Sequence, residues 1–277
     1  MAGPDLRETP MRRLMTFLRS LPILALLAVS PAGADALDDV LERGTLRVGV
    51  SEFAPWTLRT ESGDLIGFEI DLANKLASDM GVTADFKVYQ WDAIITALQA
   101  GEIDMIAGGM AITPARALQV NFSRPVATSG VGIAANTKLT ENIRTLADLN
   151  QDDITSATVA DTLAASVTER LFPDAEVKTY QTPDPAEDDV INGRAHALVT
   201  SMPEARFLVL RNPDTLDLPI SDPLLASAEG LAVRKGEQQL LNFLDAWVTA
   251  RTTDKWLATT HDYWFGTLDW LSQVNGE

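Results

Sequence analysis

The sequence contains no cysteine among its 277 residues and only two histidines. Without cysteine no disulfide can form, so the fold must depend on its hydrophobic core alone. His196 and His261 are isolated, with no serine or carboxylate at motif spacing and no cluster of metal-ligand type around them. A phosphate-binding loop, a dinucleotide fingerprint and a nucleophile elbow are also missing. We therefore expect neither a metal nor a cofactor.

Positive charge is scarce. Lysine and arginine number 22 against 39 aspartates and glutamates, which gives a formal net charge of -17 at pH 7. A surface of this kind repels nucleic acid and anionic lipid, so we expect neither as a partner. The acidic balance does not by itself indicate a cationic ligand, because acidic residues also keep a protein soluble.

No apolar run reaches the roughly 20 residues that span a bilayer. The apolar stretch from Leu21 to Val29 follows Arg12 and Arg13 and precedes the small residues of the run PAGADA. This order of charge, short apolar core and small residues is typical of a secretory signal peptide, which we predict over residues 1–36. With no cysteine at the cleavage site, we expect a periplasmic protein that is not a lipoprotein.

Strand and helix patterns alternate along the rest of the chain, which predicts an α/β fold with a mostly parallel sheet. Apolar positions recur at helical spacing after Gly67, and Gly81 ends that helix. Expected strands cover 46–50, 86–89, 130–135, 157–160, 177–180, 195–200 and 229–235, and expected helices cover 91–98, 163–171, 188–192, 240–250 and 255–263.

The stretch IDMIAGGMAITPAR, residues 103–116, is the first candidate site. Its apolar strand stops at the pair Gly108-Gly109, where a ligand can approach bare backbone. Thr113 before a proline is typical of a helix N-cap, which places Arg116 in the first turn beside free N–H groups. A guanidinium and free amides predict a carboxylate-binding site. The alternative is that Arg116 only pairs with a surface acid.

Several segments resemble the family 3 extracellular solute-binding proteins, which serve amino-acid importers. The resemblance rests on GFEIDLANKLASDM, WDAIITAL, GEIDMIAGGMAITPAR and FSRPV, and it extends from about Leu46 to Gly266. It implies a two-lobed periplasmic-binding-protein fold of type II, with mixed, mostly parallel sheets and a two-strand hinge. Lobe 1 would comprise residues 37–135 and 226–277, and lobe 2 residues 136–225. Ligands of open α/β sheets also bind where strands end.

The resemblance implies a ligand site between the lobes. Arg116 matches the arginine that holds the ligand carboxylate, together with Gly109, whereas Ala111 replaces the usual hydroxyl residue. In lobe 2, Thr162 and the amides after it are the remaining carboxylate donors, with a register uncertain by one residue. The positions that line or anchor this site are Phe53, Trp56, Trp91, Gly108, Gly109, Ala111, Arg116, Thr162 and Ser201.

Two departures leave the ligand's amine without its usual partners. Ser201 occupies the position of the family's aspartate, and Ala111 lacks the hydroxyl. A buried ammonium without a carboxylate costs several kcal/mol. Either Glu52 or Glu204 supplies the charge, or the ligand has no α-amine or a substituted one. The segment TSMPEAR also resembles the periplasmic cyclohexadienyl dehydratases, with Glu204 at the general-acid position. The alternative for Glu204 is a solvated helix residue.

We therefore predict a periplasmic substrate-binding protein of an ABC importer. It would be a monomer, capture an amino acid or related small carboxylate by closing its lobes, and then dock on the importer's membrane subunits. We expect no enzyme activity. The alternative is a prephenate or arogenate dehydratase with Glu204 as its catalytic residue, which would convert substrate and lose activity on Glu204→Gln.

Overall fold

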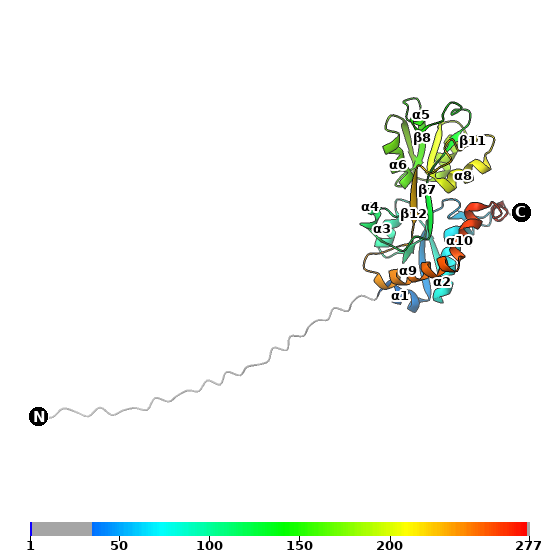
Figure 1. Cartoon of the computed structure of the whole chain (residues 1–277). Helices are drawn as coiled ribbons and strands as arrows, with labels where there is room; N and C mark the ends of the chain where they lie inside the picture. Colours follow the sequence, from blue (N-terminus) through cyan, green and yellow to red (C-terminus); the bar gives the residue numbers. More distant parts are fainter. Residues whose placement is uncertain (2–34, 276–277) are drawn as a thin grey trace. The chain divides into compact units, whose positions relative to one another are not determined.

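The computed structural model describes residue 1 and residues 35–275, and these are built around two mixed β-sheets (Figure 1). The predicted signal peptide lies almost entirely outside the described residues. Only Asp35 and Ala36, the last two residues of that predicted segment, are described, and the end of the signal peptide stays a prediction. Asp35 caps the first helix, α1 (Ala36–Arg43), and its carboxylate also accepts a hydrogen bond from the amide of Leu240. Ala36 is buried.

The first sheet has the strand order β4-β1-β5-β13-β6. Its centre is parallel, with β1 lying between β4 and β5, whereas β13 runs antiparallel to both β5 and β6. The strands are β1 (Thr45–Val50), β4 (Thr83–Val88), β5 (Met105–Ile106), β6 (Asn121–Phe122) and β13 (Ala232–Val233). A separate hairpin joins β2 (Leu58–Arg59) to β3 (Leu65–Ile66).

Helices pack against this sheet, and the apolar side chains of helices and strands together form its hydrophobic core. As predicted, the helix after Gly67 ends at Gly81, which adopts the left-handed conformation. Two tryptophans from the end of the chain fasten this helix: Trp247 Nε1 donates to Asp79 and Trp264 Nε1 donates to Asp71. The helices are α2 (Phe68–Met80), α3 (Ile94–Gln99), α4 (Pro114–Ala117), α9 (Gln238–Thr253), α10 (Trp256–His261), the π-helix η1 (Asp262–Gly266) and α11 (Leu271–Asn275).

The second sheet has the order β11-β7-β10-β8-β9, with β12 paired to β7 as well. Its parallel part, β10-β8-β9, carries the helices of this half of the chain. The strands are β7 (Ala127–Asn136), β8 (Thr155–Val159), β9 (Glu176–Tyr180), β10 (Ala197–Ser201), β11 (Leu216–Asp217) and β12 (Leu225–Glu229). The helices are α5 (Leu146–Leu149), α6 (Leu163–Leu171), α7 (Pro183–Ile191) and α8 (Met202–Arg211).

The antiparallel strands β7 and β12 lie side by side (Figure 1), and both lead toward the first sheet. Their position suits the expected hinge, although the bounds of the second strand differ from the prediction. Residues 229–235 do not form one strand: Glu229 ends β12, and Ala232 and Val233 form β13 in the first sheet. The change of sheet occurs at Gly230, where a Cβ would lie 3.1 Å from the Ile112 side chain. The division of the chain into two lobes stays a prediction.

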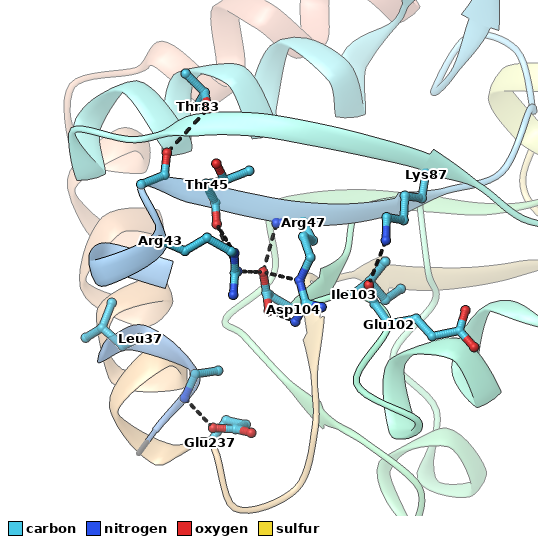
Figure 2. Close-up of polar contacts among 12 residues, drawn as sticks. Leu37, Arg43, Thr45, Arg47, Thr83, Lys87, Glu102, Ile103, Asp104 and Glu237 are labelled. Atoms are coloured by element: carbon cyan, nitrogen blue, oxygen red, sulfur yellow. Dashed lines mark hydrogen bonds and ion pairs between the residues drawn. The ribbon is translucent and has the colours of Figure 1, made fainter. Parts of the chain in front are cut away.

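A buried ion cluster closes the amino-terminal edge of the first sheet (Figure 2). Asp104, only 1% exposed, directly precedes β5 and accepts hydrogen bonds from the guanidinium groups of Arg43 and Arg47, at 2.5 and 2.6 Å. The backbone amide of Arg47 donates to the same carboxylate at 2.8 Å. This carboxylate therefore has its charge and its lone pairs satisfied by α1 and β1.

Over the described residues, no helix combines the length and the apolar character needed to span a membrane.

Candidate functional site

A cavity of about 310 Å³ is bordered by residues of both sheets. It lies where the carboxyl ends of β1, β5, β8 and β10 lead into loops, as open α/β sheets predict. All the candidate ligand-binding residues line this one cavity: Phe53, Trp56, Trp91, Gly108, Gly109, Ala111, Arg116, Thr162 and Ser201. The structure thus brings them together, and their contact with a ligand stays a prediction.

Arg116 has the surroundings of an anion-binding residue rather than those of a surface ion pair. Its guanidinium donates to two carbonyl oxygens, of Ala111 at 3.1 Å and of Asp161 at 3.0 Å, and stacks 5.4 Å from the centre of the Trp91 ring. Within residues 35–275 no carboxylate lies within ion-pair distance of it, so the alternative of a surface ion pair is wrong. Burial lowers the pKa of Arg116, against a smaller opposing effect of the Asp161 charge. The group still remains a cation.

Two amides of the first candidate site are bonded within the chain. Gly109 N–H donates to Glu69 Oε1 at 2.7 Å, and Arg116 N–H donates to the Thr113 hydroxyl, which caps α4 as predicted. A side chain on Gly109 would not fit, because its Cβ would lie 2.5 Å from Trp56 Nε1. Bare backbone at Gly109 therefore leaves room for the indole ring, and its approach by a ligand stays a prediction.

The free amides of the cavity come from the other sheet. Thr162 is the N-cap of α6. Its hydroxyl accepts from Ala165 N–H at 3.1 Å and donates to Val159 O at 2.7 Å. The first-turn amides of Leu163 and Ala164 have no acceptor within a helix, and both residues line the cavity. They can bind an anion opposite Arg116.

Ser201 and Glu204 have roles in the start of α8. The Ser201 hydroxyl caps this helix by accepting from Glu204 N–H at 3.2 Å. Glu204 is 1% exposed, so its interpretation as a solvated residue is wrong, and it is not among the residues that line the cavity. Its carboxyl is hydrogen-bonded to the Thr200 hydroxyl, and burial together with the charge of Glu187 raises its pKa well above the usual range.

Sequence reasoning missed a buried carboxyl group that lines the cavity. Glu229, 3% exposed at the end of β12, accepts a hydrogen bond from Trp56 Nε1 at 2.8 Å. Burial raises its pKa to about 8, with an opposing effect of the Trp56 bond and a further rise from nearby Glu69. Burial likewise raises the pKa of Glu69 to about 7. The available signal was a single acid within an otherwise apolar segment, ASAEGLAV.

One acidic candidate from the sequence remains, Glu52. Glu52 also lines the cavity, but it is exposed and forms an ion pair with Arg59, with 2.5 Å between the Arg59 Nε and Glu52 Oε1 atoms. Among the described residues, no group of three or more histidines, cysteines or acids could hold a metal ion. The cavity therefore offers a cation and free amides to an anion, and aromatic walls and a buried acid to the rest of a ligand.

Comparison with known proteins gives one family. The model of the bacterial extracellular solute-binding proteins, family 3, matches residues 46–267. The L-cystine-binding protein TcyJ of Escherichia coli K12 is 29% identical over 234 residues, which cover 83% of this chain and 86% of that protein. The cyclohexadienyl dehydratase of Pseudomonas aeruginosa is 24% identical over 255 residues, covering 89% of this chain and 93% of the enzyme.

Solved structures agree in fold. The ancestral amino acid-binding protein AncCDT-1, described as a precursor of cyclohexadienyl dehydratase, has 33% identity and a TM-score of 0.77, covering 84% of this chain and all of that one. A putative binding component of an ABC transporter from Wolinella succinogenes, complexed with lysine, has 29% identity and a TM-score of 0.79, covering 83% and 99%. The expected periplasmic-binding-protein fold is confirmed.

Proposed function

The chain belongs to the bacterial extracellular solute-binding proteins of family 3, and on that premise we propose that it captures an amino acid for an ABC importer. Of the proteins named above, one is L-cystine-binding, one is complexed with lysine and one is described as amino acid-binding, whereas the fourth is cyclohexadienyl dehydratase. The family and the first three relatives favour transport, and the proposal extends this to a ligand that carries an α-carboxylate.

One observation carries the proposal: Arg116 is a largely desolvated cation that borders the cavity without a carboxylate partner in the described chain. A ligand carboxylate would supply the missing anion. Its second oxygen would accept hydrogen bonds from the first-turn amides of α6, a helix on the side of the second sheet. A ligand held by groups from both sheets stabilises the closed arrangement relative to the open one, which is the physical basis of hinge closure.

The contact between Arg116 and Asp161 already joins the two sides of the cavity. The Asp161 carbonyl oxygen accepts from both Arg116 and Trp91 Nε1, at 3.0 and 3.2 Å. Asp161 adopts a positive φ of 59°, which is uncommon for a residue other than glycine and aims this carbonyl between the two donors. The two sides of the cavity are thus already in contact before a ligand binds. Ligand capture would add a carboxylate beside this contact.

Aromatic walls define the space for the ligand side chain. Phe53 and Trp56 pack with ring centres 5.3 Å apart, and both line the cavity together with Trp91. Rings of this kind accept an apolar side chain by packing or a cationic one by cation–π contact. Glu52 at the same border is exposed and paired with Arg59, so it does not decide between these two kinds of side chain.

The proposed place of action is the periplasm, and one relative is the octopine-binding periplasmic protein of Rhizobium meliloti. Export would depend on the predicted signal peptide, and the closed, ligand-bound monomer would then dock on the importer's membrane subunits. We propose no enzymatic turnover. The dehydratase alternative depended on Glu204, and this residue is not part of the cavity wall.

The test is a thermal-shift screen of the purified protein against the common L-amino acids, L-cystine and octopine. We expect at least one of them to raise the melting temperature in a concentration-dependent way, because a ligand that binds only the folded state stabilises it. Mass spectrometry after incubation with prephenate and arogenate is the parallel assay, with unchanged substrate as the expected result. No shift with any ligand would contradict the proposal, and product formation would establish the dehydratase alternative.

A further inference from the structure

We propose that Glu229 binds the ligand's ammonium group, so that the ligand is a zwitterion with its amine close to its carboxylate. This inference rests on the proposed function and names the residue that replaces the missing carboxylate of the site. Glu229 lies at the end of β12, the strand that leads out of the second sheet. Ser201, which occupies the position of the family's carboxylate, lies at the start of α8.

The first argument is the position of Glu229 relative to Ala111. These two residues form an isolated antiparallel bridge, flanked by the hydrogen bonds Ile112 N–H to Ala228 O at 2.8 Å and Gly230 N–H to Met110 O at 3.2 Å. Residues paired in this way, without a hydrogen bond to each other, have side chains on the same face and in close approach. Both line the cavity. The small Ala111 leaves room beside the Glu229 carboxyl.

The second argument is the closeness of the two charges that the ligand would meet. Arg116 Nη1 donates to Ala111 O, and Ala111 is the residue bridged to Glu229. The guanidinium and the carboxyl group are therefore both gathered around Ala111, on the wall of one cavity. Two charged groups placed around one residue suit a molecule whose ammonium and carboxylate are attached to the same or to neighbouring carbon atoms, as in an α-amino acid.

The third argument is that Glu229 has no cation of its own. Within the described residues, its carboxyl group is hydrogen-bonded to the Trp56 N–H and to the Ser129 side chain, and the acid Glu69 of α2 is nearby. No lysine, arginine or histidine of that part of the chain is within ion-pair distance. A buried acid with only neutral donors and an acidic neighbour is held protonated. An ammonium group beside it would reverse this, because the pair then forms a charge-assisted hydrogen bond.

The proton balance follows from this exchange. Before capture, Glu229 carries a proton at neutral pH, since its pKa lies at about 8. When the ligand's ammonium arrives, the carboxyl group ionises and its proton passes to solvent. Capture of a zwitterion is therefore accompanied by release of close to one proton, and its affinity rises with pH up to about 8.

The other carboxylates are less suited to this position: Asp184, which also lines the cavity, is exposed in the first turn of α7. Glu52 is exposed and already paired with Arg59. Glu204 is absent from the cavity wall and hydrogen-bonds to Thr200. If Glu52 were the partner instead, Glu52→Gln rather than Glu229→Gln would weaken capture.

The experiment is calorimetric titration of wild type, Glu229→Gln, Glu52→Gln and Glu61→Gln with the tightest amino acid of the screen and with its deaminated analogue. Glu61 is exposed and lines neither this cavity nor its neighbour, so Glu61→Gln is the matched control. We expect Glu229→Gln to weaken the amino acid by roughly thirtyfold or more, the usual effect of removing one member of a desolvated charge pair. Binding of the deaminated analogue should change by less than about threefold, because it has no ammonium to lose a partner.

The same titrations in two buffers of different ionisation enthalpy measure the proton release. Wild type should release close to one proton per amino acid at pH 7 and bind about tenfold more tightly at pH 7 than at pH 6. Glu229→Gln should release no proton when it binds the amino acid, and its affinity should be the same at pH 6 and pH 7. Glutamine keeps an acceptor for Trp56, and an unchanged circular dichroism spectrum would verify folding. Equal affinity of wild type and Glu229→Gln overturns this inference alone, whereas failure of wild type to bind any amino acid overturns the proposed function.

Discussion

The two edges of the first sheet each bury a carboxyl group, in opposite surroundings. At the amino-terminal edge, Asp104 is bonded to two guanidinium groups and a backbone amide (Figure 2). At the carboxyl-terminal edge, Glu229 has only the neutral partners Trp56 and Ser129, an acidic neighbour and an open cavity. Asp104 is 1% exposed and Glu229 3%, so burial does not distinguish them. The difference lies in whether the chain itself supplies the counter-charge.

A buried ionised group that the chain fully pairs is a structural element, since removing one partner leaves the others unsatisfied. A buried group that the chain leaves without a counter-ion lowers stability and is retained where a ligand completes it. Arg116 belongs to the second class as well, with carbonyl oxygens but no carboxylate around it. The comparison thus predicts that substitutions at one edge change folding and substitutions at the other change binding.

Arg116→Ala should have the largest effect on binding. The account predicts a loss of about 2–5 kcal/mol in binding free energy, because the ligand carboxylate would lose its only desolvated cation. Titration calorimetry with the tightest ligand of the screen measures it. Arg124→Ala, a substitution of an exposed arginine, is the matched control and should leave the dissociation constant unchanged. Equal affinity in both variants would remove Arg116 from the site.

The ligand-free protein should lose stability as pH rises from about 4.5 to about 8. Glu69 and Glu229 have pKa values of about 7 and 8 when folded, against 4.5 for an unperturbed glutamate. In that interval the unfolded chain binds fewer protons than the folded protein does. The free energy of unfolding therefore falls as pH rises, by several kcal/mol for Glu69 and Glu229 together. Urea unfolding at several pH values checks this.

The double variant Glu69→Gln, Glu229→Gln is the control for that pH dependence. Glutamine does not titrate, so its unfolding free energy should vary less with pH over the same interval, and it should exceed the wild-type value at pH 8. Parallel curves for wild type and the double variant would mean that other groups cause the slope.

Asp104→Ala should lower the free energy of unfolding by about 2–4 kcal/mol, since two arginines and an amide would lose a buried charged acceptor. In a domain of this size the melting temperature would fall by roughly 5–15 °C. The dissociation constant of the ligand should stay within about twofold. Asp85→Ala, at an exposed position on β4 of the same sheet, is the comparison variant. A large loss of affinity in Asp104→Ala would break the contrast between the two edges.

Ser201→Ala and Thr162→Ala should have the smallest effects. Both hydroxyls accept from helix N–H groups, so each variant loses an N-cap worth about 1 kcal/mol of stability. Thermal melts and titrations of the two variants together distinguish capping from ligand contact. If either variant weakens binding more than tenfold without a change in melting temperature, that hydroxyl contacts the ligand directly.

Local signals made much of the fold predictable. The helix Leu163–Leu171, the end of α2 at Gly81 and the cap at Thr113 agree with the structure, because apolar spacing and capping depend on residues close in sequence. The same holds for the gathering of the candidate residues at strand ends. What was missed depended on contacts between distant segments: the Gly109 amide bonds to Glu69, which precedes it by 40 residues.

Glu229 shows the same limit more clearly. It stands in an apolar segment whose pairing changes from the second sheet to the first within a few residues, so its face cannot be read from alternation. Its cavity position results from pairing with Ala111, and its burial from Trp56, which is 173 residues away. Glu204, in contrast, was placed on the right helix but at the wrong exposure.

A crystal structure of the protein with its tightest amino acid tests the central claim most directly. The account predicts density for one ligand in the cavity, with its carboxylate within hydrogen-bond distance of Arg116 and of the first-turn amides of α6. A ligand bound elsewhere, or one whose carboxylate faces away from Arg116, would contradict the account.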